Sequence, residues 1–119
     1  MIDLQTYNDT CAALTGTHYV MQWGDAHVWK VGEKVFAMAR EMPDGAMHVT
    51  FKASDMTWEV FCDAEGVRPA PYLASRGLKW LQRTDDSAMD DETLLGLLAD
   101  SHRMAAANLT KKRRAELGL

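Results

Sequence analysis

The sequence predicts a single α+β domain, a two-layer sandwich in which an antiparallel meander sheet packs against helices. Residues 18–52 alternate apolar and polar side chains with a period of two, as strands do. The segments on either side carry apolar residues every three or four positions, as helices do. Helices separated along the chain from a run of antiparallel strands are typical of the α+β class. The 119 residues fit one domain, 1–119.

The first element is a helix predicted over residues 3–14. Its apolar side chains Leu4, Tyr7 and Cys11 recur at spacings of three and four, and they therefore line one face. Gly16 follows at a position where glycine commonly ends a helix.

Four strands are predicted next, in the segments HYVMQW, HVWKV, KVFAMAR and AMHVTFK. These segments are rich in the β-branched and aromatic residues that favour strands. Gly32-Glu33 separates the second segment from the third as a two-residue turn, and Pro43-Asp44-Gly45 separates the third from the fourth. Such short turns predict an antiparallel meander.

A second helix is predicted after Ser54, a favourable N-cap. Its apolar face holds Met56, Val60 and Ala64, joined by Phe61 and by Trp58 on one edge. Two prolines then interrupt regular structure. The segment LKWLQR, residues 78–83, alternates again and is predicted as a fifth strand.

The chain closes with helical structure. A long helix is predicted from near Ser87 or Asp90, because Leu94 and Leu98 belong to an apolar ridge at helical spacing. Thr110 can cap a short final helical turn. The predicted order of elements is α-ββββ-α-β-α.

The composition is that of an ordinary globular protein, with 47% hydrophobic and 25% charged residues and a net charge of −4. A negative net charge disfavours non-specific nucleic-acid binding, because phosphate contacts need positive charge. The charge is uneven, however. Residues 67–84 carry four bases and no acid, and residues 103–119 carry five bases against one acid.

The N-terminal segment lacks the basic and apolar regions of a signal peptide, and no stretch approaches the ~18 apolar residues of a membrane span. Cys11 and Cys62 lie far apart and in no paired motif, which indicates two small side chains in a reduced compartment rather than a disulfide. These observations predict a cytoplasmic protein without a membrane partner.

Known catalytic and cofactor motifs are absent from the sequence. Neither the G-x-S-x-G of hydrolases nor the phosphate-binding loops G-x-x-x-x-G-K-[ST] and G-x-G-x-x-G occur. The histidines lack metal-ligand spacing. The carboxylates at 85–86 and 90–92 flank a predicted helix start, where negative charge is favourable without any catalytic role. We therefore expect no enzyme activity, no catalytic residue, no cofactor and no metal.

Aromatic residues offer a further candidate contact. Trp29 and Trp80 lie in predicted strands, where aromatic side chains usually belong to the core. Trp23 differs, because it precedes Gly24-Asp25 in a turn and is the tryptophan most expected to be exposed. An exposed ring can alternatively be a stacking platform for a base or another planar ligand.

Basic side chains are the candidate contacts for a nucleic acid. Lys79 and Arg83 belong to the predicted fifth strand, and we expect both to point outward from the same side of it. The basic tail, Lys111-Lys112-Arg113-Arg114, also has an ordinary explanation, since cations at a helix end offset the helix dipole. The full candidate set is Lys30, Lys34, Arg40, Arg76, Lys79, Arg83, Lys111, Lys112, Arg113 and Arg114.

Three blocks of the sequence, HVWKVGEKVFAMAR, PAPYLASRGLKWLQ and SHRMAAANLTKKRRAEL, resemble the MmcQ/YjbR family. That family is often described as a DNA-binding "double wing" domain, and the resemblance covers roughly residues 3 to 117. It implies a compact α+β sandwich with an antiparallel sheet, and DNA as the partner. The chain departs from the family pattern before Trp80, where Arg76 and Lys79 stand in place of two lysines and a histidine.

Two hypotheses of function follow. In the first, the chain is a nucleic-acid-binding module that uses the basic set. In the second, it binds a protein partner or a small molecule without catalysis. The placement of the basic side chains distinguishes the two, because cations gathered on one face favour DNA and an exposed apolar patch favours a partner.

Overall fold

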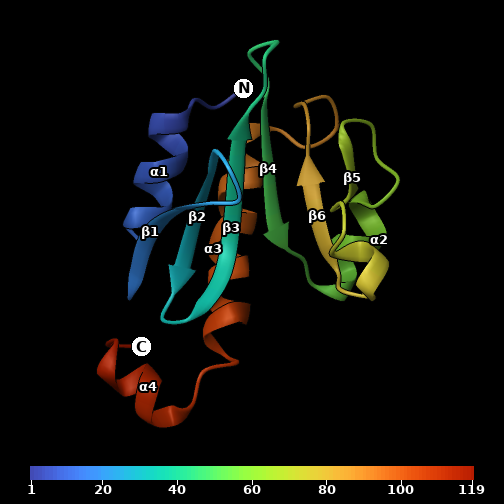
Figure 1. Ribbon diagram of the computed structural model, residues 1–119. Helices are drawn as coiled ribbons and strands as arrows, with labels where there is room; N and C mark the ends of the chain where they lie inside the picture. The colour runs from blue at the N-terminus through green and yellow to red at the C-terminus, as the bar shows by residue number, and fades with distance from the viewer.

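The computed structural model describes residues 1–119 and shows one antiparallel sheet with helices on one side (Figure 1). The sheet has six strands in the spatial order β1-β2-β3-β4-β6-β5. The strands are β1 Thr17–Gln22, β2 Ala26–Val31, β3 Lys34–Glu41, β4 Met47–Lys52, β5 Val67–Pro69 and β6 Trp80–Arg83. The helices are α1 Leu4–Ala12, α2 Asp55–Phe61, α3 Asp91–Ala106 and α4 Lys111–Glu116, with a 3-10 turn η1 at Ala74–Arg76.

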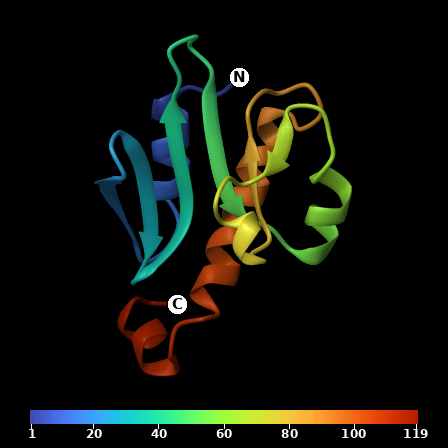
Figure 2. The ribbon, with the colours of Figure 1, turned by 45° about the vertical axis from the view of Figure 1, so that its right-hand side comes forward.

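Helices α1 and α3 cover one face of the sheet, and α3 runs behind the central strands in Figure 1. The turned view in Figure 2 shows α2 at the β5 end of the sheet and α4 beyond the β2–β3 turn. The predicted two-layer α+β sandwich is therefore confirmed. The apolar core lies between the two layers, and its fully buried large side chains include Tyr7, Phe36, Val49, Phe51, Leu81, Leu94 and Leu98.

The structure adds one strand to the predicted order. Strand β5 holds three residues and pairs with β6 at the sheet edge, where Val67 lies opposite Arg83 and Pro69 opposite Leu81. The sequence prediction missed this strand because a proline argues for a break. A proline lacks the N–H group that an inner strand needs, but an edge strand tolerates it. The observed order is α-ββββ-α-β-β-α-α.

Helix α2 buries only part of the predicted apolar face, the part formed by Trp58 and Phe61. The apolar spacing predicts Met56 and Val60 on the buried side, but these side chains are 77% and 63% exposed. Trp58 and Phe61 pack against the core instead. Apolar residues occur all round this seven-residue helix, so their spacing alone could not choose a face. The two aromatic rings have the larger apolar area to remove from water.

Helix α3 is tied to the sheet by a buried hydroxyl group. Asp90 caps the helix, since its Oδ1 accepts a hydrogen bond from Thr93 N at 2.8 Å. Farther along, Ser101 Oγ donates to the carbonyl oxygen of Phe36 on β3 at 2.6 Å and accepts from the N–H of Lys52 on β4 at 2.9 Å. Ser101 is fully buried, and its two bonds fix α3 across the two central strands.

The turn between β2 and β3 is built around Gly32, as predicted. Gly32 has a φ of +56°, a left-handed conformation that disfavours residues with a Cβ atom. It is buried beneath the C-terminal segment. Side-chain carbons of Leu117 and Leu109 lie 3.0 Å and 3.3 Å from the place that a Cβ atom would occupy. The absence of a side chain therefore lets the C-terminal segment pack on the meander.

Gly32→Ala is expected to lower the free energy of unfolding by about 2 kcal/mol, because backbone strain and overpacking against two leucines add. Gly45→Ala is the matched control. Gly45 also has a positive φ, +87°, but no atom lies within 4 Å of its Cβ position, so only the strain of about 1 kcal/mol is expected there. Urea denaturation measures both losses, and equal losses would contradict the packing explanation.

Candidate ligand-binding cleft

The face of the sheet away from α1 and α3 carries a row of side chains that crosses all six strands. The strand registers place these residues opposite one another, so they stand side by side on the same face. The row is apolar at its β1 end and polar at its β5 end. Its members, in order, are Val20, Val28, Met38, Thr50, Gln82 and Arg68.

The polar end of this row is held by a chain of hydrogen bonds. Arg68 donates from Nε and Nη2 to Gln82 Oε1, at 2.8 Å and 2.6 Å. Gln82 Nε2 in turn donates to Thr50 Oγ1 at 3.1 Å. The partner of Arg68 is thus a neutral amide, which orients the guanidinium group without neutralising its charge.

A cleft of about 620 Å³ lies over this part of the sheet. Its lining comes from β3, β4, β5 and β6, from the start of β2 and the turn before it, and from the loop that carries η1. Arg40, Arg68, Arg76 and His48 line it, and none of its fifteen lining residues is acidic. The cleft is therefore a concave site with positive charge, in a protein whose net charge is −4.

Arg40 stiffens one side of the cleft. Its Nε donates to Asp25 Oδ1 at 2.8 Å, and its Nη2 donates to the carbonyl oxygen of Trp23 at 2.7 Å. The hydrogen bond from Arg40 lowers the pKa of Asp25 below its usual value. Arg40 thereby holds the β1–β2 turn in place, and Asp25 offsets most of its charge.

The two other arginines keep their charge available. Arg76 is exposed, and its guanidinium group makes no hydrogen bond or ion pair. His48 lies between the strands that carry Arg40 and Arg68, and burial together with the charge of Arg68 lowers its pKa. At neutral pH His48 is therefore uncharged, and Arg68 and Arg76 supply the positive charge that a ligand would meet.

Two exposed aromatic residues line the same cleft. Trp23 lies in the β1–β2 turn and Tyr72 in the loop after β5. They are 58% and 86% exposed, so folding does not remove most of their apolar surface from water. They are also the only non-glycine residues with a positive φ, +49° for Trp23 and +69° for Tyr72. Both loops thus hold a strained backbone that presents a ring to solvent. The expectation that Trp23 is exposed in a turn is confirmed.

The predicted basic set does not form one surface. Lys34 opens β3 and Arg40 lies near its other end, about 20 Å away along an extended strand. Lys30 lies on β2 opposite His18, toward the same end of the sheet as Lys34. Lys79 forms an ion pair with Asp55 at 2.9 Å at the start of α2. Of the ten candidates, the cleft brings together Arg40 and Arg76.

The basic tail lies elsewhere. Its four bases form most of α4, which lies beyond the β2–β3 turn at the end of the molecule away from the tip of the β3–β4 hairpin (Figure 1). Arg113 is paired with Glu33 of the turn, and this contact raises its pKa. Lys111 and Lys112 are exposed at the first positions of the helix. These residues form a separate basic region that the cleft does not include.

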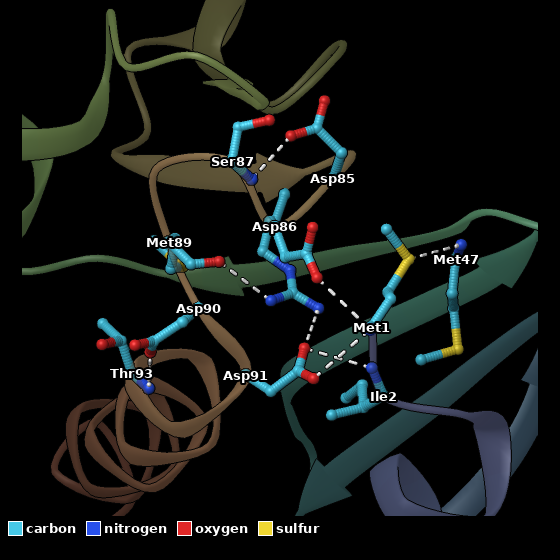
Figure 3. Close-up of polar contacts among 11 residues, drawn as sticks. Met1, Ile2, Met47, Asp85, Asp86, Ser87, Met89, Asp90, Asp91 and Thr93 are labelled. Atoms are coloured by element: carbon cyan, nitrogen blue, oxygen red, sulfur yellow. Dashed lines mark hydrogen bonds and ion pairs between the residues drawn. The ribbon is translucent and has the colours of Figure 1, made fainter.

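The prediction that Arg83 points outward is wrong. Its side chain is fully buried, because Arg83 shares the helix-facing side of β6 with the core residue Leu81. Arg83 Nη1 donates to the carbonyl oxygen of Met89 at 3.0 Å, and Nη2 forms an ion pair with Asp91 Oδ1 at 3.0 Å. Figure 3 shows Met89 and Asp91, which make these two contacts, and the amino group of Met1, which contacts Asp86 and Asp91. Arg83 therefore joins β6 to the start of α3 and is not available to a nucleic acid.

Sequence reasoning overlooked most of the cleft. Arg68 is one of the four bases in residues 67–84, but the proline that follows it does not favour a strand there. The period of two in LKWLQR could have placed Gln82 on the outer side of its strand. Nothing in the sequence marks Tyr72 as strained, because a left-handed backbone at tyrosine has no sequence signature.

The other reactive side chains form no further centre of this kind. No three His, Cys, Asp or Glu residues come together in a way that could hold a metal ion. Cys11 is buried on the core-facing side of α1, and burial raises the pKa of its thiol to about 12. No helix has both the length and the apolar character that a membrane crossing requires.

Comparison with known proteins identifies the family. The family model described as YjbR matches residues 12–104, most of the chain. The chain belongs to the YjbR family. The resemblance seen in the three sequence blocks is thus confirmed. No curated protein matches the chain.

Solved structures share the YjbR fold of this chain. The crystal structure of Deinococcus radiodurans protein DR2400, with the domain DUF419, is 24% identical and has a TM-score of 0.85, over 100% of this chain and 90% of that one. A protein from Pseudomonas syringae is 15% identical with a TM-score of 0.69, over 87% of this chain and 99% of that one. At these identities the likeness concerns the fold.

Proposed function

We propose that this YjbR-family chain is a non-enzymatic nucleic-acid-binding domain and that its contact surface is the cleft on the open face of the sheet. The observation that carries the proposal is the charge of the cleft. Arg68 and Arg76 present guanidinium groups without a carboxylate partner, and the lining holds no acidic residue. The paired N–H donors of a guanidinium group match the oxygens of a phosphate.

The rest of the molecule supports this choice of site. The net charge of −4 repels a phosphate backbone in general, so a local cationic hollow determines where an anion can approach. The neutral His48 adds a group that can form hydrogen bonds beside Arg68, and it adds no further positive charge. The resemblance to a family often described as DNA-binding points to the same class of ligand.

A small anionic molecule is the second candidate. The cleft volume of about 620 Å³ lies within the range of roughly 300 to 1,000 Å³ that small-molecule sites occupy. A free nucleotide or another phosphate-bearing metabolite would meet the same two arginines. Such a ligand would raise the melting temperature of the protein by several degrees at saturating concentration. A nucleic acid, in contrast, would bind through contacts to several phosphates.

The test of the proposed function is a fluorescence anisotropy titration of a labelled DNA oligonucleotide at several salt concentrations. Contacts from two or three arginines are expected to give a slope of log affinity against log salt of about −1.4 to −2, since each phosphate contact on a single strand contributes about −0.7. No binding at low salt and tens of micromolar protein would overturn the proposal. Binding without salt dependence would also contradict it.

A further inference from the structure

We infer that the nucleic acid bound in the cleft is single-stranded, and that Trp23 and Tyr72 stack on its unpaired bases while Arg68 and Arg76 hold its phosphates. This inference rests on the proposed function and makes it narrower. It assigns the two aromatic side chains a role that the charge of the cleft does not require.

The first step is the cost of the two aromatic positions. Trp23 and Tyr72 keep 58% and 86% of their surface exposed, although folding favours burial of aromatic rings. Each also has a left-handed backbone, which L-residues other than asparagine and aspartate rarely adopt. Neither residue gains a core contact in exchange, because neither packs against the hydrophobic cluster. A ligand that covers the rings would explain both costs.

The second step is the position of the rings relative to the charges. Both rings line the cleft that Arg68 and Arg76 line. Tyr72 and Arg76 come from the same loop, and Ser75 Oγ within it donates to the Tyr72 carbonyl oxygen at 2.7 Å, which restrains the loop. Trp23 is restrained by the hydrogen bond from Arg40 to its carbonyl oxygen. The cleft thus combines two unpaired cations, one of them oriented by Gln82, with aromatic side chains on restrained loops, and cations beside aromatic faces are the combination that single-strand-binding surfaces use.

The third step concerns the strand state of the ligand. In a duplex the flat faces of the bases are already stacked on their neighbours, so an aromatic side chain can reach them only after unstacking, which costs a few kcal/mol. An unpaired base offers its face at no such cost. A concave site lined by aromatic rings therefore favours a single strand over a duplex of the same length.

The test compares three labelled DNA ligands of equal length in anisotropy titrations with the full chain. They are a single strand, the same strand with consecutive abasic nucleotides at its centre, and the duplex. The single strand is expected to bind about a hundredfold more tightly than the abasic strand, about tenfold for each ring, because the abasic strand keeps every phosphate but lacks the stacking bases. It is also expected to bind more tightly than the duplex.

Variants connect this preference to the two rings. Trp23→Leu and Tyr72→Leu are each expected to weaken single-strand binding about tenfold and to leave abasic-strand binding nearly unchanged. Trp23→Phe and Tyr72→Phe keep a ring and should retain most of the affinity. Tyr19→Leu is the matched control, because Tyr19 is also exposed but lies on the helix-facing side of β1 and does not line the cleft. Circular dichroism melting curves verify that each variant is folded.

The outcomes separate the inference from the proposed function. Equal affinity for the single strand and the abasic strand would overturn the stacking inference. The proposed function would stand, because binding to the phosphates would remain. A duplex that binds at least as tightly as the single strand would overturn it as well. If none of the three ligands binds at low salt, both proposals fall, and a free mononucleotide that binds as tightly as the strand would assign the cleft to a small molecule.

Discussion

Asp91→Asn is expected to lower the free energy of unfolding by about 3 kcal/mol, because it leaves the guanidinium group of Arg83 buried without a counter-charge. Arg83 has no exposed surface, and neither its Nε nor its Nη2 has a hydrogen-bond partner, so Asp91 acts on Nη2 as a counter-charge. Water cannot replace the lost carboxylate at such a position without rearrangement of the core. Asp91 also accepts the N–H of Ile2 at 3.1 Å. Urea denaturation with an unchanged m-value would measure the loss.

Replacement of Arg83, the other partner of the ion pair, is expected to lower the free energy of unfolding by less. Arg83→Met leaves Asp91, whose side chain is 37% exposed, and water can solvate that carboxylate. We expect a loss of about 1 kcal/mol, and the double variant should recover most of the Asp91→Asn loss. Asp86→Asn is the control, since Asp86 is 49% exposed and contacts the amino group of Met1 rather than Arg83. If Asp91→Asn lowers the free energy of unfolding by less than Asp86→Asn does, that result would contradict a stabilising role of the buried ion pair.

The stability difference between the wild type and Asp91→Asn should also depend on pH. Burial alone would raise the pKa of Asp91, but Arg83 and the N–H of Ile2 outweigh it and hold the pKa below its usual value. The stability that the carboxylate contributes is therefore fully present above its unfolded pKa, about 3.9. It is lost as the pH falls through the lower folded pKa. The difference between the two proteins is expected to narrow in strong acid.

Arg68→Gln combined with Arg76→Gln is expected to lower the affinity for single-stranded DNA at least tenfold at low salt. Each substitution removes a charge-assisted contact to phosphate, and exposed contacts of this kind contribute about 1 kcal/mol each. The slope of log affinity against log salt should become shallower by about 1.4, the contribution of two phosphates on a single strand. Anisotropy titrations over the same salt range as for the wild type measure both changes.

Lys111→Gln combined with Lys112→Gln is the matched control for this experiment. It removes the same two charges from α4, which the cleft does not include. We expect only a small uniform weakening from the change in net charge. An equal loss of affinity in the two double variants would show that binding depends on general charge or on the basic tail. The cleft would then lose its role as the contact surface.

The pattern of the sequence was sufficient for most of the fold. The period of two between residues 18 and 52 predicted β1 to β4, and the turn residues Gly32 and Gly45 fixed where the chain reverses. These features are local, because a strand alternates its side chains and a tight turn needs a left-handed residue regardless of what lies beyond it. The three-residue β5 was missed because its only stabilisation is pairing with β6, whose position the local sequence does not reveal.

The candidate site was largely beyond prediction from the sequence. A run of bases shows that cations are close together in the sequence, but each residue of a strand faces one side of the sheet or the other. Arg83 illustrates the failure, since it faces the core and pairs with a carboxylate on α3. Arg68 illustrates the opposite, since it points over the open face and is oriented by Gln82. Pairing registers between distant strands decide both outcomes.

By itself, the sequence determined the α+β class, the four-stranded meander, the helical ridge of α3 and the exposed turn at Trp23, because period, capping residues and turn residues act over a few positions. Only the tertiary structure decided which cations remain free. It buried Arg83, paired Lys79 and Arg113 with acids, and gathered Arg68 and Arg76 beside two aromatic residues with a strained backbone. The physical reason is that charge pairing and burial are set by residues that are distant in the chain and meet only when the sheet closes on its helices.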